Sequence, residues 1–323
     1  MLNFDFTRPI AKELNLVEAK LTENVDSKLS LLNEASNHLI KAGGKRMRPA
    51  FALLSAKFFK DDLQEIIPLA VALELVHMAT LVHDDVIDNS QTRRGRDTVN
   101  KTWGNRMSIY SGNYIFARSL SLIAAYERSD VIEVMADAST KICEGEIIQM
   151  LSCYNVELGL KNYLRRIERK TALLISLSCQ LGAMLCNNAS KNDINALRLY
   201  GYYLGMAFQI TDDILDFTAD EKVLGKPAGS DIRQGVITLP VLYALKNDKH
   251  NKELANLIRS PELCVSAAER IIDIIVNSGG IEYAYNVTAR FVYKAQRQLE
   301  PLPDVAIKST LLYMTDFIQE RAF

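Results

Sequence analysis

The distribution of proline restricts the fold of this chain more strongly than any other feature of its sequence. None of the eight prolines lies between Pro68 and Pro227. An interior proline costs a helix about 3 kcal/mol, so this long stretch can form uninterrupted helices. Its apolar residues recur every three or four positions, which indicates helices rather than strands. We therefore expect an all-α fold, with helices near residues 10–41 (interrupted), 49–60, 66–88, 106–126, 129–153, 160–186, 190–217, 236–247, 250–258, 263–277, 280–299 and 303–321.

Local turn signals separate these predicted helices. Gly43 and Gly44 end one helix, and Ser190 is a candidate N-cap for another. Residues 223–232, VLGKPAGSDI, contain two glycines and a proline and predict a loop. The chain has no internal repeat, low-complexity run or linker, so we expect a single all-helical domain over residues 1–323.

Composition and charge exclude several classes of protein. The chain is 48% hydrophobic and 24% charged, as in globular proteins with a sizeable core, and its net charge of −1 argues against a nucleic-acid partner. The best candidate for a membrane span, residues 172–186, is shorter than the about 20 apolar residues that a bilayer requires, so no transmembrane segment is expected. The N-terminus lacks the pattern of a signal peptide. Five cysteines without a CxxC pair predict small buried side chains in a reducing compartment, the cytoplasm.

An apolar segment ends in a cluster of aspartates. Residues 69–82 are apolar apart from Glu74 and His77, and a helix that is apolar on nearly every side belongs in a protein core. Asp84 and Asp88 follow at a spacing of four, which places both carboxylates on one face of the helix, with Cβ atoms about 5–6 Å apart. Two aligned carboxylates repel unless a cation lies between them, and oxygen-only ligands favour Mg²⁺.

The same pattern recurs later in the chain, at Asp212 and Asp216 in residues 206–217. A single cluster of this kind is more often a solvated surface patch, but the repetition favours two motifs that face one another across a pocket. So many carboxylates would need several cations nearby. Basic residues of the right kind are Lys45, Arg46, Arg48, Arg93, Arg94, Lys170 and Lys226. This combination of acid and base predicts a site that holds diphosphates through Mg²⁺.

Four motifs in this order resemble those of the trans-isoprenyl diphosphate synthases. They are GGKRMRP at 43–49, LVHDDVIDNSQTRRG at 81–95, the Lys170-Thr171 pair and FQITDDILDF at 208–217. The sequences of residues 164–183, 224–245 and 317–323 further resemble those of the catalytic large subunits of bacterial heptaprenyl diphosphate synthases. The resemblance implies an isoprenoid synthase fold, a single large antiparallel helical bundle around a deep central cavity, with the two aspartate motifs facing across its mouth.

The resemblance also implies roles for individual residues. Two or three Mg²⁺ ions per active site would be held by Asp84, Asp88, Asp212 and Asp216. The allylic diphosphate would contact Arg93, Lys170 and Lys226. Isopentenyl diphosphate would bind in a separate metal-free pocket formed by Lys45, Arg48, His77 and Arg94. Thr171 and Gln209 would face the carbon that becomes cationic. Without the resemblance, His77 reads more simply as a hydrogen-bonded core histidine.

The residues before the first motif bear on product length. Short-chain members of the family place an aromatic ring four or five positions before the first aspartate, where this chain has Thr80 and Ala79. Val76 and Leu73, one and two turns further back, leave no ring either. A growing chain could then pass, so we expect a product of about C30–C45, with heptaprenyl favoured by the resemblance, for the side chain of menaquinone.

The implied substrates are isopentenyl diphosphate and an allylic diphosphate, with farnesyl diphosphate as the expected primer. The implied assembly is a homodimer or a heterodimer with a small non-catalytic subunit, with transient membrane contact for product release. One departure from many relatives is the absence of a lysine in residues 235–238, where a diphosphate contact is lost. Two alternatives stay open. One is a non-autonomous or regulatory subunit of a two-component synthase. The other is a class I terpene cyclase, which would need neither the second aspartate motif nor a second basic pocket.

Overall fold

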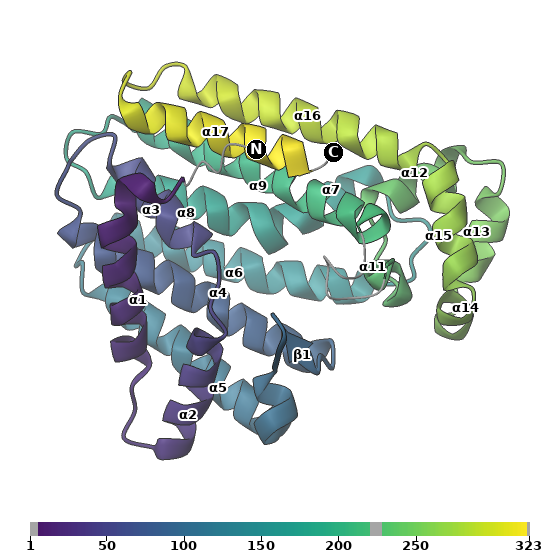
Figure 1. Cartoon of the computed structure of the whole chain (residues 1–323), viewed down its shortest axis with the longest axis horizontal. Coiled ribbons are helices and arrows are strands. Elements are labelled where there is room, and N and C mark those ends of the chain that lie inside the picture. Colours follow the sequence, from purple (N-terminus) through teal and green to yellow (C-terminus); the bar gives the residue numbers. More distant parts are fainter. Residues whose placement is uncertain (1–5, 220–227, 322–323) are drawn as a thin grey trace. The chain divides into compact units, whose positions relative to one another are not determined.

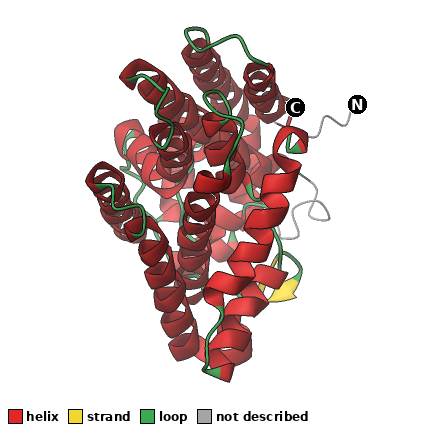
Figure 2. Ribbon diagram, turned by 90° about the vertical axis from the view of Figure 1, so that its left-hand side faces the viewer, coloured by secondary structure: helices red, strands yellow, loops and turns green. Residues whose placement is uncertain are grey.

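The computed structural model describes residues 6–219 and 228–321, and nearly all of the elements in these ranges are helices (Figures 1 and 2). The α-helices are α1 (Ala11–Val25), α2 (Ser30–Lys41), α3 (Met47–Ala56), α4 (Ile67–Ile87), α5 (Val99–Ala124), α6 (Ser129–Ser152), α7 (Leu160–Ile167), α8 (Leu173–Met184), α9 (Lys191–Thr218), α11 (Ser230–Arg233), α12 (Leu239–Asn247), α13 (Asn251–Ile258), α14 (Pro261–Ser266), α15 (Ala268–Asn277), α16 (Gly280–Leu299) and α17 (Ala306–Arg321). The other elements are the 3-10 turns η1 (Arg8–Ile10) and η2 (Gln64–Ile66), the π-helical segment η3 (Glu168–Ala172), and the antiparallel pair β1 (Thr92–Arg93) and β2 (Arg96–Asp97). The predicted all-α class is confirmed.

The described residues form two compact units, and four helices contain a boundary between them. Unit 1 comprises the described parts of residues 1–136, 177–198 and 302–311, and unit 2 those of residues 137–176, 199–301 and 312–323. The boundaries fall inside α6, α8, α9 and α17. One domain over residues 1–323 stays a prediction.

Helix α4 is the centre of unit 1. Every residue from Leu69 to Val76 is buried, as the apolar sequence of this helix predicts. Helices α1, α3 and α5 pack directly against α4, and α2 packs against α5 (Figure 1). Because its neighbours cover it on several sides, α4 holds its C-terminal aspartates in a defined place.

The predicted location of the most membrane-like segment is wrong. In the described part of the chain, residues Gln64–Ile87, and not residues 172–186, are long and apolar enough to cross a membrane. In the most apolar window of Gln64–Ile87, 72% is buried inside the protein, which is the behaviour of a core helix. Three of the five free cysteines are buried as predicted, and the prediction is wrong for Cys143, which is exposed.

Helix boundaries follow local capping chemistry where the sequence supplies it. Ser190 and Asp193 form a capping box: the Asp193 backbone N–H donates to Ser190 Oγ (3.2 Å), and Asp193 Oδ2 accepts from the Ser190 backbone N–H (3.0 Å). Helix α5 begins earlier than predicted, at Val99, because Thr98 caps it by accepting from Lys101 N–H (3.1 Å). Gly104, with φ of 80°, then kinks the helix.

The core of unit 2 is built by the C-terminal half of α9 and by α7, α12, α15 and α16. Ile210 and Ile214 of α9 and Tyr163 of α7 are fully buried in it. Helix α12 packs against α13, α15 and α16. The single helix predicted for residues 263–277 is instead two, α14 and α15, because Ala267 has non-helical angles (φ −103°, ψ 15°). Residues 223–227 of the predicted loop lie outside the described residues, and the loop prediction is wrong for Ser230–Ile232, which belong to the helix α11.

One glycine in unit 1 permits a very close approach of two helices. A Cβ atom on Gly182 of α8 would lie 2.2 Å from the Ala52 carbonyl oxygen of α3. We expect Gly182→Ala to lower the free energy of unfolding by about 1–3 kcal/mol, because the helices must separate to admit a methyl group. Urea denaturation measures this loss. Gly159→Ala is the matched control, since a Cβ there meets nothing within 4 Å. Equal stabilities of the two variants would contradict the prediction.

Candidate functional site

The first aspartate motif lies at the C-terminal end of α4, in unit 1. Asp84 is partly exposed, Asp88 is exposed, and Asp85 between them is buried, at 3% exposure. The backbone N–H of Asp88 donates to the Asp84 carbonyl (2.8 Å), so the helical turn continues through the motif. The i,i+4 pair therefore presents two carboxylates on the accessible side, as predicted.

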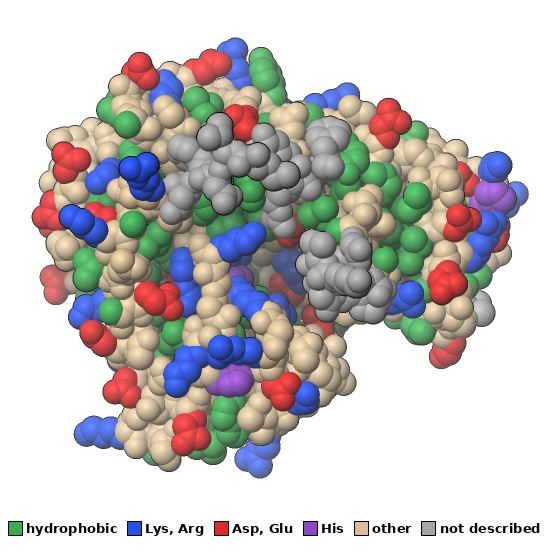
Figure 3. Space-filling view, viewed as in Figure 1, with side chains coloured by type: hydrophobic (Ala, Val, Ile, Leu, Met, Phe, Trp, Pro, Cys, Tyr) green, Lys and Arg blue, Asp and Glu red, His purple; other side chains and the backbone are tan. Residues whose placement is uncertain are grey.

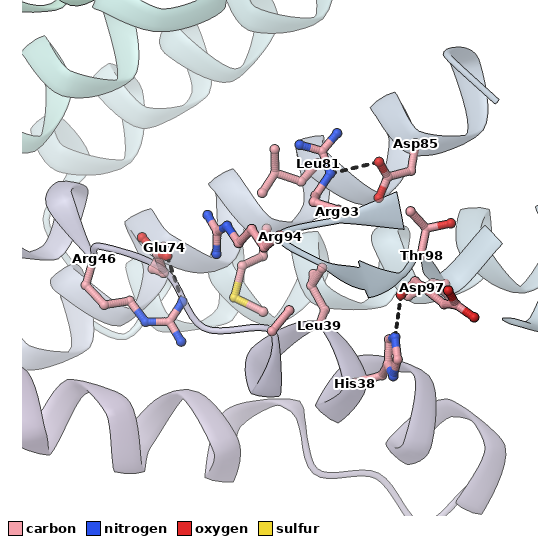
Figure 4. Close-up of a pocket in the computed structure, with 13 residues that line it drawn as sticks. His38, Leu39, Arg46, Glu74, Leu81, Asp85, Arg93, Arg94, Asp97 and Thr98 are labelled. Carbon is pink, nitrogen blue, oxygen red and sulfur yellow. Dashed lines mark hydrogen bonds and ion pairs between the residues drawn. The ribbon is translucent and has the colours of Figure 1, made fainter. Parts of the chain in front are cut away.

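Asp85 has a different role, because it holds an arginine. Arg93 Nε donates to Asp85 Oδ1 (2.8 Å; Figure 4). Burial raises the pKa of Asp85, and the charge and hydrogen bond of Arg93 oppose this rise. Arg93 ends β1 and pairs with Arg96 of β2, and the tight turn between them has positive φ at Arg94 and Gly95, of 54° and 74°. The bond to Asp85 engages Nε, so the terminal nitrogens of Arg93 are left as donors for a diphosphate.

A group of arginines in unit 1, here called the basic cluster, joins the GGKRMR segment to the same hairpin. Its members are Arg46 and Arg48 from that segment and Arg94 from the hairpin. Gly44 lies against Arg94, since a Cβ on Gly44 would be 2.5 Å from Arg94 Nη1. Figure 4 shows Arg94 pointing toward the region of Arg46 and Glu74. Lys45 is exposed on this loop. Basic side chains gather on the molecular face over α2 and α4, with histidines among them (Figures 1 and 3).

Glu74 is the buried counter-ion of this cluster. Glu74 Oε1 accepts from Arg46 Nη1 (3.0 Å), and both side chains are nearly inaccessible, at 2% and 9% exposure. Arg46 also makes a bidentate pair with Glu18 of α1, with both bonds at 2.7 Å. The charge of Glu74 partly offsets burial at Arg48, where burial lowers the pKa to about 10. Arg48 Nε and Glu74 Oε2 are buried and have no hydrogen-bond partner among the described residues.

His77 is kept neutral by its surroundings. Burial, followed by the charges of Arg48, Arg94, Arg93 and Arg46, lowers its pKa well below 6.5. A neutral imidazole can donate one hydrogen bond and accept another. The cluster therefore offers cationic arginines and one neutral donor, which fits a diphosphate bound without a metal.

The pKa of His77 predicts a dependence of stability on pH. Because the folded state resists protonation at His77 and the unfolded state does not, stability is retained above pH 6.5 and lost as the pH falls below it. Between pH 7.5 and 5.5 we therefore expect the free energy of unfolding to fall, and His77→Gln should remove the part of this fall that comes from His77. Urea denaturation of both proteins at the two pH values measures the difference. A His77 NMR signal that titrates near pH 6.5 would contradict the prediction.

The second aspartate motif lies near the C-terminal end of α9, in unit 2. Asp212 is partly exposed, whereas Asp213 and Asp216 are buried, at 2% and 1% exposure. Asp216 Oδ2 accepts from the Asp231 backbone N–H (3.1 Å), and the Asp216 carbonyl accepts from Gly229 N–H (2.7 Å). Asp212 is therefore the accessible carboxylate of this motif, and Asp216 joins α9 to the start of α11.

A chain of hydrogen bonds runs behind Asp212. Tyr163 Oη donates to Asp213 Oδ2 (2.7 Å), Gln209 Nε2 donates to Asp213 Oδ1 (2.9 Å), and Thr171 Oγ1 donates to Gln209 Oε1 (2.6 Å). Burial and the charge of Asp231 raise the pKa of Asp213 to about 7. Next to Thr171, the Nζ atom of Lys170 lies 3.5 Å from Oε2 of Glu146.

The donor set fits Mg²⁺ shared with a substrate. Among the described residues, no three His, Cys, Asp or Glu side chains lie close enough to hold a metal by themselves. Mg²⁺ binds through one or two carboxylates and takes its other ligands from water and phosphate oxygens. In unit 1 the accessible pair Asp84 and Asp88 meets that requirement, and in unit 2 the partly exposed Asp212 is a carboxylate of the same kind.

The predicted site residues are divided between the two units. Unit 1 contains Asp84, Asp88, Arg93, Arg94, Lys45, Arg48 and His77. Unit 2 contains Lys170, Thr171, Gln209, Asp212 and Asp216, and Lys226 lies outside the described residues. The sequence interpretation did not assign roles to Glu74, Asp213 and Tyr163. For Glu74 a signal existed, since a glutamate in an otherwise apolar helix needs a buried cationic partner.

Comparison with known proteins decides the family. The family model described as Polyprenyl synthetase matches residues 29–275. This chain belongs to the polyprenyl synthetase family. It is 45% identical to heptaprenyl diphosphate synthase component 2 of Geobacillus stearothermophilus over 97% of both chains. It is 44% identical to the protein of that name from Bacillus subtilis (strain 168), over 96% of this chain and 88% of the other.

A solved structure agrees with these relatives. The crystal structure of heptaprenyl diphosphate synthase from Staphylococcus aureus matches with a TM-score of 0.90 and 39% identity, over 99% of both chains. The all-α isoprenoid synthase fold and the predicted family are thereby confirmed. This polyprenyl synthetase is a prenyltransferase, a trans-polyprenyl diphosphate synthase.

Proposed function

We propose that the chain is a long-chain all-trans polyprenyl diphosphate synthase. It condenses isopentenyl diphosphate head-to-tail onto an allylic diphosphate, with farnesyl diphosphate as primer, and makes a heptaprenyl product within about C30–C45 for the side chain of menaquinone. The observation that carries the proposal is identity of 44–45%, over nearly the full length of this chain, to proteins named heptaprenyl diphosphate synthase component 2. Ala79 in α4, where short-chain relatives have a ring, supports the long product.

The accessible carboxylates are proposed to bind the leaving diphosphate through Mg²⁺. Asp84, Asp88, Asp212 and Asp216 would hold the ions; of these, Asp216 is buried and its Oδ2 accepts from the Asp231 backbone N–H. Bound Mg²⁺ would supply Lewis-acid stabilisation of the negative charge that develops as the allylic C–O bond breaks. Arg93, oriented by Asp85, adds two terminal nitrogens toward the same oxygens. Lys170 and Lys226 complete the proposed contacts.

The basic cluster of unit 1 is proposed to hold the second substrate. Arg48 and Arg94 would offer guanidinium groups, neutral His77 would offer one donor, and Lys45, exposed on the neighbouring loop, would add an ammonium group. Glu74 limits the repulsion among these cations. Because Arg48 and Arg94 are cationic, the cluster would bind isopentenyl diphosphate directly rather than through a metal.

In the proposed reaction the allylic C–O bond breaks, a carbon–carbon bond forms and one proton is lost. Loss of diphosphate leaves an allylic cation, which the oxygens of Thr171 and Gln209 face in this proposal. The double bond of isopentenyl diphosphate attacks the cation and forms a carbon–carbon bond. The proton lost from the new tertiary cation passes to the released pyrophosphate, so no side-chain base is required.

Incorporation of labelled isopentenyl diphosphate tests the proposal. With farnesyl diphosphate and Mg²⁺, we expect a C35 product on chromatography and no incorporation with excess EDTA. A cyclic product without incorporation would support a class I terpene cyclase and overturn the proposal.

The cytoplasm supplies both substrates, and transient membrane contact would accompany release of the product.

The two heptaprenyl diphosphate synthase relatives are each called component 2, which favours a heterodimer. We infer that this chain is the catalytic partner of a small non-catalytic subunit. Turnover by the purified chain should then rise several-fold when that subunit is added. Full turnover by the chain alone would instead support a homodimer.

A further inference from the structure

Asp213 differs from the other aspartates of the two motifs in its surroundings. It is 2% exposed, and each of its carboxylate oxygens accepts a hydrogen bond, from Tyr163 at one and from Gln209 at the other. Asp212 is partly exposed on the same helix. A buried carboxylate whose two oxygens are held by donors is poorly suited to bind a metal shared with a substrate.

The chemistry of a carboxylate determines how Gln209 must be oriented. Tyr163 Oη donates to Oδ2 of Asp213 and Gln209 Nε2 donates to Oδ1, so each carboxylate oxygen serves as an acceptor. Gln209 therefore presents its NH₂ group to Asp213, and its oxygen points the other way, where Thr171 Oγ1 donates to it (2.6 Å). Because the Thr171 proton is engaged there, the lone pairs of the Thr171 oxygen stay available to a positive carbon. A reversed amide would turn the Thr171 hydroxyl around.

The far end of this chain of bonds is anchored in the core. Tyr163 is fully buried, and the Arg166 guanidinium lies 5.5 Å from the centre of its ring. Arg166 Nη2 in turn donates to the Ile237 carbonyl. Asp213 therefore cannot rotate freely, and its direction is transmitted to Gln209.

The near end is positioned by backbone geometry. Thr171 lies in the π-helical segment η3, whose wider turn displaces it from the regular α-helical register. A Cβ on Gly205 would lie 2.5 Å from Ala172 Cα, so α9 and η3 approach closely beside Thr171. This approach places the Thr171 hydroxyl within hydrogen-bond distance of Gln209.

We propose that Asp213 and Tyr163 are positioning residues that orient the Gln209 amide and the Thr171 hydroxyl toward the cationic carbon. The inference rests on the proposed function, in which these two side chains face that carbon. It gives the second aspartate of the motif a task separate from metal binding.

Tyr163→Phe and Asp213→Asn test the proposal in the complete protein. We expect each to lower kcat by about 10–100-fold, since small displacements of oriented groups have effects of this size. KM for both substrates and the Mg²⁺ concentration for half-maximal rate should stay within about twofold of the wild type. Tyr200→Phe is the matched control, because Tyr200 is also a fully buried tyrosine of unit 2 and is no member of the chain from Tyr163 to Thr171.

A double-mutant comparison separates positioning from structure. If Tyr163 acts through Gln209, then Tyr163→Phe should reduce kcat much less in a Gln209→Ala background than in the wild type. Equal effects in both backgrounds, an unchanged kcat, or an equal loss in Tyr200→Phe would overturn the proposal. A large rise in the Mg²⁺ requirement of Asp213→Asn would assign Asp213 to the metal instead. Failure of the proposed function is a distinct result, since the wild type would then incorporate no isopentenyl diphosphate.

Discussion

Asp84→Asn is expected to lower kcat by about 10²–10³-fold, the usual loss when a group that stabilises leaving-group charge is removed. Asparagine keeps the size of the side chain and removes the negative charge that attracts Mg²⁺. Asp84 is partly exposed at the C-terminal end of α4, so the substitution leaves the core of unit 1 intact. Steady-state assays over a range of Mg²⁺ concentrations should show part of the activity returning at high Mg²⁺.

Two further variants define this experiment. Asp212→Asn should give a loss of similar size, because the corresponding carboxylate of the second motif is also accessible. Asp137→Asn is the matched control, since Asp137 is an exposed carboxylate paired with Lys141 on α6. Near-normal turnover of both Asp84→Asn and Asp212→Asn at low Mg²⁺ would show that the motifs do not hold the ions.

Ala79→Phe is expected to shorten the product from about C35 to about C20. Ala79 lies five residues before Asp84 and is 1% exposed; in the proposed function the elongating chain must pass this residue, so an added aromatic ring would block it. Because Ala79 is already enclosed, passage of the chain requires neighbouring side chains to move aside. Reversed-phase chromatography of the dephosphorylated products measures the change in length.

Ala79→Ser provides the control for this substitution, because it changes the residue without adding a ring. Its product should keep the wild-type length. Thermal unfolding of both variants shows whether overpacking has damaged the fold. A fully folded Ala79→Phe enzyme that still makes the long product would remove Ala79 from the account of chain length.

Local patterns predicted the helices well because each pattern needs only neighbouring residues. The absence of proline after Pro68 and the apolar period of α4 require no knowledge of the rest of the chain. The start of α5 and the break between α14 and α15 were not predicted, because each depends on a single residue. Thr98 starts α5 early by capping it, and Ala267 interrupts a continuous apolar pattern between α14 and α15. Backbone angles at single residues leave little trace in hydrophobic periodicity.

The sequence by itself determined the all-α class, the spacing that places Asp84 and Asp88 on one helix face, and the family motifs. Tertiary structure decided which charged groups are partners. Glu74 meets Arg46 across 28 residues of sequence, and Tyr163 meets Asp213 across 50. Helical periodicity states which side of a helix is buried, but a hydrogen bond depends on which neighbour packs there. For that reason the buried carboxylates that orient the site became visible only in the folded chain.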